Sequence, residues 1–126
     1  MKKIETKYSK NAKGHYSPGV LHNGTLYISG QISKNLETGQ VPADFEEEVI
    51  QALNNVELVL HNAGLSKENV LMTRAFIPSI ELWDSFNTAY AKWFGEHKPA
   101  RIVIPCGALH YGCRVEIEAV AAADGL

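Results

Sequence analysis

Apolar residues follow two periodicities along this chain, and the alternating stretches predict strands. The pair Asn23-Gly24 separates two short apolar runs, residues 20–22 and 25–29, which is typical of a two-residue hairpin turn. Residues 4–7 are expected to form a short first strand. The stretches 11–18 and 35–42 contain glycine and proline, so we expect loops there.

Two stretches carry apolar residues at helical spacing. From residue 45 to residue 63, apolar positions recur every three or four residues, which predicts one apolar helix stripe. Asp44 is a suitable N-cap for this helix, and Gly64 is suited to end it. Ser79 is expected to cap a second helix, whose apolar face runs from residue 83 to residue 94.

Three further strands are predicted at residues 69–78, 101–109 and 113–122, the last two joined by a tight segment at 110–112. The order is β-β-β-α-β-α-β-β in one α+β domain spanning residues 1–126, with one mixed sheet and two helices on one face. Residues 101–109 alternate too weakly for a solvated second face. We therefore expect self-association into a small closed assembly to bury that face.

Composition and charge exclude several classes of function. The chain has 126 residues and a formal net charge of −2, without a basic tract, which argues against a partner bound through nucleic-acid phosphates. No apolar stretch is long enough to span a bilayer. The charged N-terminus lacks an apolar signal core, and two cysteines give no disulfide framework. These features predict a cytoplasmic, reduced protein.

Charged residues stand on two strands that are otherwise apolar. Arg101 opens one, while Glu116 and Glu118 share one face of the other. A guanidinium near a carboxylate could hold a small carboxylic acid and activate a water molecule. The alternative is an Arg–Glu pair that only aligns neighbouring strands. Spacing alone does not choose between the two glutamates.

Other residues leave their roles open. Cys106, His110 and Cys113 are close enough in sequence for a metal site, or for a cysteine nucleophile activated by histidine, but two buried apolar cysteines are the simpler interpretation. The charges of Glu46, Glu47 and Glu48 are expected to be solvated in the first turn of a helix.

The loop residue Tyr16 could pack its ring or bind a ligand. Ser29 and Gly30 end a hairpin strand, and glycine there permits either close approach of a ligand or a β-bulge.

Taken together, seven short motifs in this chain resemble the RidA/YjgF family of imine deaminases, formerly labelled endoribonuclease L-PSP. They are residues 14–19 (GHYSPG), 26–31 (LYISGQ), 38–42 (TGQVP), 51–56 (QALNNV), 63–65 (AGL), 99–101 (PAR) and 115–119 (VEIEA). The resemblance implies a chorismate-mutase-like fold and homotrimers whose sheets pack inward, with ligand clefts between subunits. It implies hydrolysis of reactive 2-imino or enamino acids to 2-keto acids and ammonia, without a cofactor.

The resemblance also assigns roles to residues. Arg101 is similar to the family arginine that grips the substrate carboxylate, and Glu116 to the glutamate that orients the attacking water. Tyr16 is similar to a loop tyrosine that lines the cleft from the adjoining subunit, and Ser29 and Gly30 match the segment that meets the ligand. Val103 stands where many members have cysteine, which excludes a thiol role at that position.

Three alternative functions remain at this point. One is a trimer that binds small metabolites without turnover. Another is a deaminase for a different substrate, such as 2-aminomuconate. The third is a ribonuclease, which the acidic balance and the lack of a basic and aromatic surface disfavour.

Overall fold

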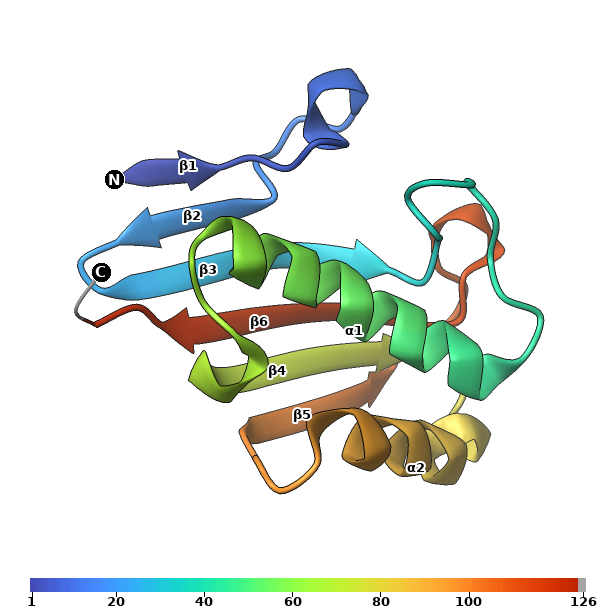
Figure 1. Cartoon of the computed structure of the whole chain (residues 1–126). Helices are drawn as coiled ribbons and strands as arrows, with labels where there is room; N and C mark the ends of the chain where they lie inside the picture. The colour runs from blue at the N-terminus through green and yellow to red at the C-terminus, as the bar shows by residue number, and fades with distance from the viewer. Residues whose placement is uncertain (125–126) are drawn as a thin grey trace.

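The computed structural model describes residues 1–124 and contains one six-stranded sheet and two α-helices (Figure 1). Four short 3-10 segments, η1 to η4, connect some of these elements. The strands and helices in chain order are β1 (Lys2–Ile4), β2 (Gly19–His22), β3 (Thr25–Ile32), α1 (Phe45–Asn62), β4 (Val70–Ile77), α2 (Trp83–Phe94), β5 (Ala100–Pro105) and β6 (Glu116–Ala122). The predicted order of strands and helices is confirmed.

The sheet is mixed, and both helices cover the same face of it, as predicted (Figure 1). Its strand order is β1-β2-β3-β6-β4-β5, with β4 and β5 parallel and the other neighbours antiparallel. Parallel neighbours need a crossover connection, and α2 supplies it between β4 and β5. This topology places β6, which carries Glu116, near the middle of the sheet and β5, which carries Arg101, at its edge.

The core lies between the helices and the sheet, because β6 and α1 both show the expected periodicity. Ile117, Ala119 and Ala121 are buried on the helix side, whereas Glu116 and Glu118 lie on the opposite, open face. The apolar stripe of α1 packs onto this layer through Val49, Ala52, Leu53, Val56, Val59 and Leu60.

The open face carries apolar residues, as the weak alternation of the fifth strand predicted. Tyr27 is 52% exposed and Ile102 is 48% exposed, and both share this face with Glu118 through the strand register. Exposed apolar residues on a sheet face favour self-association. The trimer itself stays a prediction.

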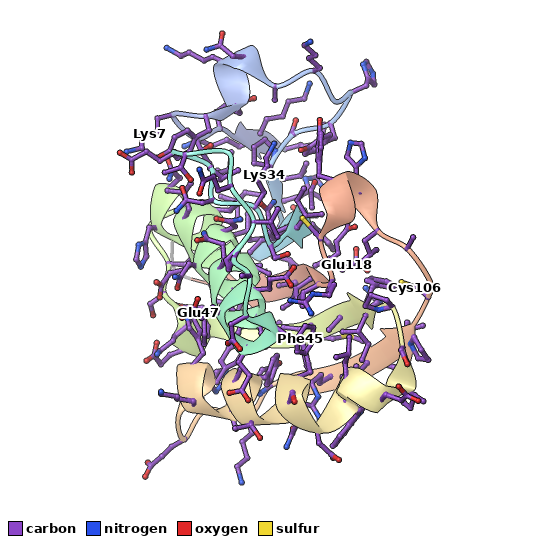
Figure 2. The ribbon with its side chains drawn as sticks, turned by 90° about the vertical axis from the view of Figure 1, so that its right-hand side faces the viewer. Lys7, Lys34, Phe45, Glu47, Cys106 and Glu118 are labelled. Carbon is purple, nitrogen blue, oxygen red and sulfur yellow. The ribbon has the colours of Figure 1, made fainter. Side chains whose placement is uncertain are left out.

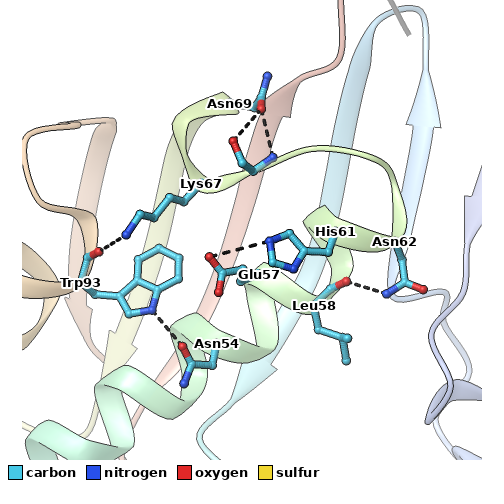
Figure 3. Close-up of polar contacts among 9 residues, drawn as sticks. Asn54, Glu57, Leu58, His61, Asn62, Lys67, Asn69 and Trp93 are labelled. Carbon is cyan, nitrogen blue, oxygen red and sulfur yellow. Dashed lines mark hydrogen bonds and ion pairs between the residues drawn. The ribbon is translucent and has the colours of Figure 1, made fainter.

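Side-chain contacts join the two helices and the η2 segment (Lys67–Asn69). The indole Nε1 of Trp93 donates to Asn54 Oδ1 at 2.9 Å, and the Lys67 ammonium donates to the Trp93 carbonyl at 2.7 Å (Figure 3). The same ammonium lies 4.9 Å from the centre of the Trp93 ring. These contacts fix α2 relative to α1, and therefore fix the side chains that α2 presents to β5.

Several predicted boundaries were wrong. The first strand is Lys2–Ile4 rather than 4–7, because the Ser9 hydroxyl accepts from Thr6 N–H at 3.0 Å and turns the chain there. The fifth strand ends at Pro105 rather than 109, and the sixth begins at Glu116 rather than 113. Gly107 has a φ of 88°, which an extended strand does not allow.

The last two strands are also not neighbours, because β4 lies between β5 and β6. Residues 106–115 therefore form a long connection that contains η4 (His110–Gly112), not a tight turn.

Glu48 contradicts the prediction of a solvated charge, since only 1% of it is exposed. Its carboxylate accepts from the Ser33 hydroxyl at 2.9 Å, the Arg114 N–H at 2.9 Å and the Arg114 Nε at 2.5 Å. Arg114 in turn donates to the Ala43 carbonyl at 2.8 Å. Glu46 and Glu47 are exposed as expected. The Glu48 carboxylate is buried and depends on these donors, whereas the Arg114 side chain is 39% exposed, so the cluster ties the start of α1 to the segment before β6.

No helix within residues 1–124 has the length and apolar character needed to cross a bilayer.

Candidate functional site

A groove of about 1010 Å³ lies on the chain where the N-terminal segment, the end of β3, the start of β6 and η4 meet. Tyr16, Ser29, Gly30 and Glu116 all line it, so the structure brings together four of the five predicted site residues. Figure 2 views the molecule from the side on which the N-terminal segment and η4 approach each other. Arg101 is not among the residues that line this groove.

Gly30 and Glu116 are in direct contact. The register between β3 and β6 shifts between Ile28 and Gln31, so Ser29 and Gly30 form a bulge. The bulge interpretation of Gly30 is confirmed, and the bulge also lets the Glu116 carboxylate lie against the glycine, whereas close approach of a ligand stays a prediction. A Cβ atom at position 30 would overlap Glu116 Oε2. The glycine therefore determines where this carboxylate points.

Ser29 anchors the loop that carries Tyr16. Its hydroxyl donates to the Ser17 carbonyl at 2.6 Å, and its backbone N–H donates to the Pro18 carbonyl at 2.9 Å. Tyr16 is 62% exposed and borders the groove. Ser29 thus positions the loop tyrosine, while the tyrosine hydroxyl stays available to a ligand.

Strand partners distinguish the two glutamates on β6. Glu118 forms an ion pair with Arg74 on β4, with 3.3 Å between Oε1 and Nη1. Within residues 1–124, the Glu116 carboxylate accepts no hydrogen bond and forms no ion pair, although the Glu116 backbone pairs with β3 and β4. An unpaired, half-buried carboxylate at a groove retains its acceptor capacity for water. The geometry therefore favours Glu116 over Glu118 for contact with a ligand.

We expect Gly30→Ala to lower activity at this groove about tenfold, because the new methyl group must displace the Glu116 carboxylate. The methyl group would meet only the flexible end of the Glu116 side chain, and the φ of Gly30 is not positive. The melting temperature should therefore change little. Steady-state kinetics and thermal unfolding of the same preparation measure both. Full activity with an unchanged carboxylate position would contradict the assigned contact.

Arg101 lies on the other side of the sheet, against α2. Its Nη1 donates to Asn87 Oδ1 at 2.9 Å, and its guanidinium carbon lies 4.8 Å from the centre of the Tyr90 ring and 5.5 Å from that of Trp83. No carboxylate of residues 1–124 pairs with it. The predicted alternative of an Arg101–Glu116 or Arg101–Glu118 pair is therefore wrong.

The Tyr90 ring lies neutral beneath Arg101, as an ordinary tyrosine does near neutral pH. Burial raises the pKa of Tyr90, and it outweighs the hydrogen bond from Thr73 and the charge of Arg101, which both lower it. The hydroxyl oxygens of Tyr90 and Thr73 are 2.7 Å apart. The guanidinium therefore rests on an uncharged aromatic surface, and its charge is not neutralised within the chain.

Arg101 and Glu116 occupy opposite faces of the sheet. Arg101 pairs in register with Thr73, which is buried on the helix side. Glu116 pairs with Phe76 and extends from the open face. One chain by itself does not present both groups to the same small ligand.

The cysteines differ in their surroundings. Cys113 is 2% exposed, which confirms a small buried residue, but Cys106 is exposed, so the same prediction was wrong there. In the described part of the chain, no three His, Cys, Asp or Glu side chains gather closely enough to hold a metal ion. His110 instead stacks on Tyr111, with 3.7 Å between ring centres.

Sequence reasoning did not identify Asn87, which holds the Arg101 guanidinium, or Trp83, which packs beside it. The two residues lie one helical turn apart on α2, the helix just before the strand that carries Arg101, and this spacing was the available signal. Lys34 and Tyr111, which line the groove, were also missed. They lie in loops, where periodicity carries no information.

Comparisons with known proteins identify the family of this chain. A family model described as endoribonuclease L-PSP matches residues 6–123. A RutC family protein of Aquifex aeolicus is 39% identical over 123 residues, covering 96% of this chain and 98% of the relative. A human protein named 2-iminobutanoate/2-iminopropanoate deaminase is 40% identical over 119 residues, covering 94% and 87%.

Among solved structures, Escherichia coli TdcF with bound serine superposes with a TM-score of 0.90 at 32% identity, covering 97% of this chain and 98% of that one. Family match, identity and fold agree over almost the whole length. The chain belongs to the endoribonuclease L-PSP family, which is the RidA/YjgF family that its motifs predicted.

Proposed function

We propose that this protein hydrolyses reactive 2-imino acids, such as 2-iminopropanoate and 2-iminobutanoate, to 2-keto acids and ammonia. The proposal is supported by relatives that carry the deaminase name and by the contact between Glu116 and Gly30 in the groove. The main supporting observation is that the Arg101 guanidinium is half-buried and has no acidic partner in residues 1–124.

The contacts of Arg101 leave its guanidinium able to bind a carboxylate. A single hydrogen bond to Asn87 and the faces of aromatic rings fix the guanidinium, which leaves most of its five N–H donors free. A planar guanidinium binds a carboxylate through two parallel hydrogen bonds. In the proposal, Arg101 therefore orients the substrate through its carboxylate.

The site is composite in this proposal. Because Arg101 and Glu116 lie on opposite faces of one sheet, a second copy of the chain supplies one of them. Arg101 stands on the edge strand β5, where an adjoining subunit has access. A closed homotrimer would place this edge against the groove of a neighbour and cover the apolar open face.

The chemistry requires no nucleophilic side chain. Water held by the Glu116 carboxylate adds to the imine carbon, the water oxygen forms the new C–O bond, and the C=N π-electrons move to nitrogen. Proton transfer from the added water to nitrogen gives a carbinolamine. The hydroxyl proton of the carbinolamine then moves to nitrogen, the C–N bond breaks with its electron pair on ammonia, and an oxygen electron pair forms the carbonyl of the 2-keto acid. Glu116 takes and returns a proton, which suits a carboxylate with free acceptor positions.

The direct test is an imine-hydrolysis assay. An amino-acid oxidase generates the imine from alanine or 2-aminobutanoate in the cuvette, and keto-acid formation is followed with and without this protein. We expect the protein to accelerate hydrolysis above the spontaneous rate in proportion to its concentration. Saturable binding of the 2-keto acid without any increase in the rate of imine hydrolysis would instead indicate a metabolite-binding trimer. Acceleration with 2-aminomuconate alone would indicate a different deaminase.

A further inference from the structure

We propose that Lys34 is a specificity residue, and that the groove accepts 2-imino acids whose side chain carries a second carboxylate. The inference rests on the proposed function, because it places the reacting end of the substrate at Glu116. It concerns the far end of the same groove, which is lined by Lys34, Tyr111 and His110.

A buried amide holds the backbone from which the Lys34 side chain extends. Asn55, which is 5% exposed, donates through Nδ2 to the carbonyls of Ile32 at 2.9 Å and Lys34 at 2.8 Å. Ile32 is the register partner of Glu116. Lys34 therefore follows two residues after the register partner of Glu116, beyond the end of β3 and past a bend at Ser33.

The Lys34 ammonium rests on an aromatic ring rather than on an acid. Its Nζ lies 4.3 Å from the centre of the Tyr111 ring. Figure 2 places Lys34 between the N-terminal segment and η4. Among residues 1–124 no carboxylate is paired with it. A cation–π contact positions the ammonium but does not neutralise its charge, so the charge stays available to an anion.

The backbone at Tyr111, in the connection between β5 and β6, has an unfavourable conformation. Tyr111 has a φ of 59°, in the left-handed region, and Gly112 follows with a φ of 72°. A bulky residue adopts this conformation only where its surroundings impose it. Tyr111 is 62% exposed, so burial of its ring does not impose the conformation, and the ring contacts Lys34 and His110.

The charges along the groove favour an anionic side chain. Lys7 and Lys13 line the groove together with Lys34, whereas Glu118 is paired with Arg74. Glu116 is the remaining acid, and it lies at the reacting end. A substrate with one carboxylate on Arg101 would meet Glu116 at its imine carbon and direct a second carboxylate toward Lys34. Short dicarboxylic imino acids, derived from acidic amino acids, have this shape.

The test compares two imines made in the cuvette by amino-acid oxidases, 2-iminosuccinate from aspartate and 2-iminopropanoate from alanine. Lys34→Met should lower kcat/KM for 2-iminosuccinate about tenfold, mainly through KM, because the lost contact is remote from the reacting atoms. The same variant should change 2-iminopropanoate hydrolysis less than about twofold. Lys34→Arg should restore most of the loss, and Lys92→Met, on exposed α2 surface, is the matched control.

Equal losses for both imines in Lys34→Met would overturn the inference, and so would a wild-type protein that hydrolyses 2-iminopropanoate but not 2-iminosuccinate. Either result would leave the proposed function intact. Hydrolysis of neither imine by the wild-type protein would contradict the proposed function itself, and this inference with it.

Discussion

Replacing Glu116 by glutamine is expected to lower kcat for imine hydrolysis by about 100-fold or more, because the amide cannot take a proton from the attacking water. The substitution keeps the size of the side chain and its contact with Gly30. The Glu116 carboxylate has no polar partner within residues 1–124, so removing its charge should leave the melting temperature almost unchanged. Kinetics and thermal unfolding of one preparation separate these effects.

Glu118→Gln is the matched comparison for this experiment. It removes a similar charge two residues along the same strand face, from an exposed ion pair with Arg74. Exposed pairs contribute about 0–1 kcal/mol to stability, so a small effect on folding and on kcat is expected. A large loss in Glu118→Gln with near-normal Glu116→Gln would assign the water-orienting role to Glu118 instead.

Replacing Arg101 by alanine is expected to lower kcat/KM by about 100-fold, equivalent to about 3 kcal/mol, through loss of the carboxylate contact. Arg101→Lys should recover only part, because an ammonium lacks the planar fork. Arg101→Ala should also reduce stability slightly, since the guanidinium packs on Tyr90 and Trp83. Lys98→Ala, at a nearby exposed cation, should leave the kinetics unchanged.

Mixing the two inactive variants tests whether the site is composite. If Arg101 of one subunit acts with Glu116 of its neighbour, randomly reassembled trimers of Arg101→Ala and Glu116→Gln regain intact sites. About one quarter of the sites would then hold both groups. The recovered activity of the refolded mixture measures this fraction. Full retention of activity by Arg101→Ala alone would refute the carboxylate contact, and no recovery on mixing would place both groups within one subunit.

The sequence was sufficient for the order and type of the elements because the periodic stretches are long. The alternation in β6 and the apolar stripe of α1 each predicted which side faces the core, and both predictions are confirmed. Boundaries were less predictable where a side chain redirects the backbone. Ser9 and Thr6 end β1 early, and Gly107 ends β5 early, by local contacts and dihedral angles that composition does not reveal.

The site was predictable in its residue types but not in its arrangement. Motif resemblance selected Tyr16, Ser29, Gly30 and Glu116, which the fold places around one groove. It did not reveal that Arg101 lies on the far side of the sheet, because that follows from the register that pairs Arg101 with Thr73 and Thr73 with Ala119. Asn87 and Lys34 were missed because an amide on a helix and a lysine in a loop resemble ordinary surface residues until their contacts are known.

Glu48 has a consequence for the evolution of this groove. One buried carboxylate joins Ser33, beyond the bulge that holds Gly30, to Arg114, just before Glu116. The position of the Glu116 carboxylate and the stability of the fold therefore depend on the same buried side chain. A substitution of Glu48 would destabilise the fold as well as move Glu116. A change of substrate is therefore more readily reached by substitutions in the outer loops, where Lys34 and Tyr111 lie.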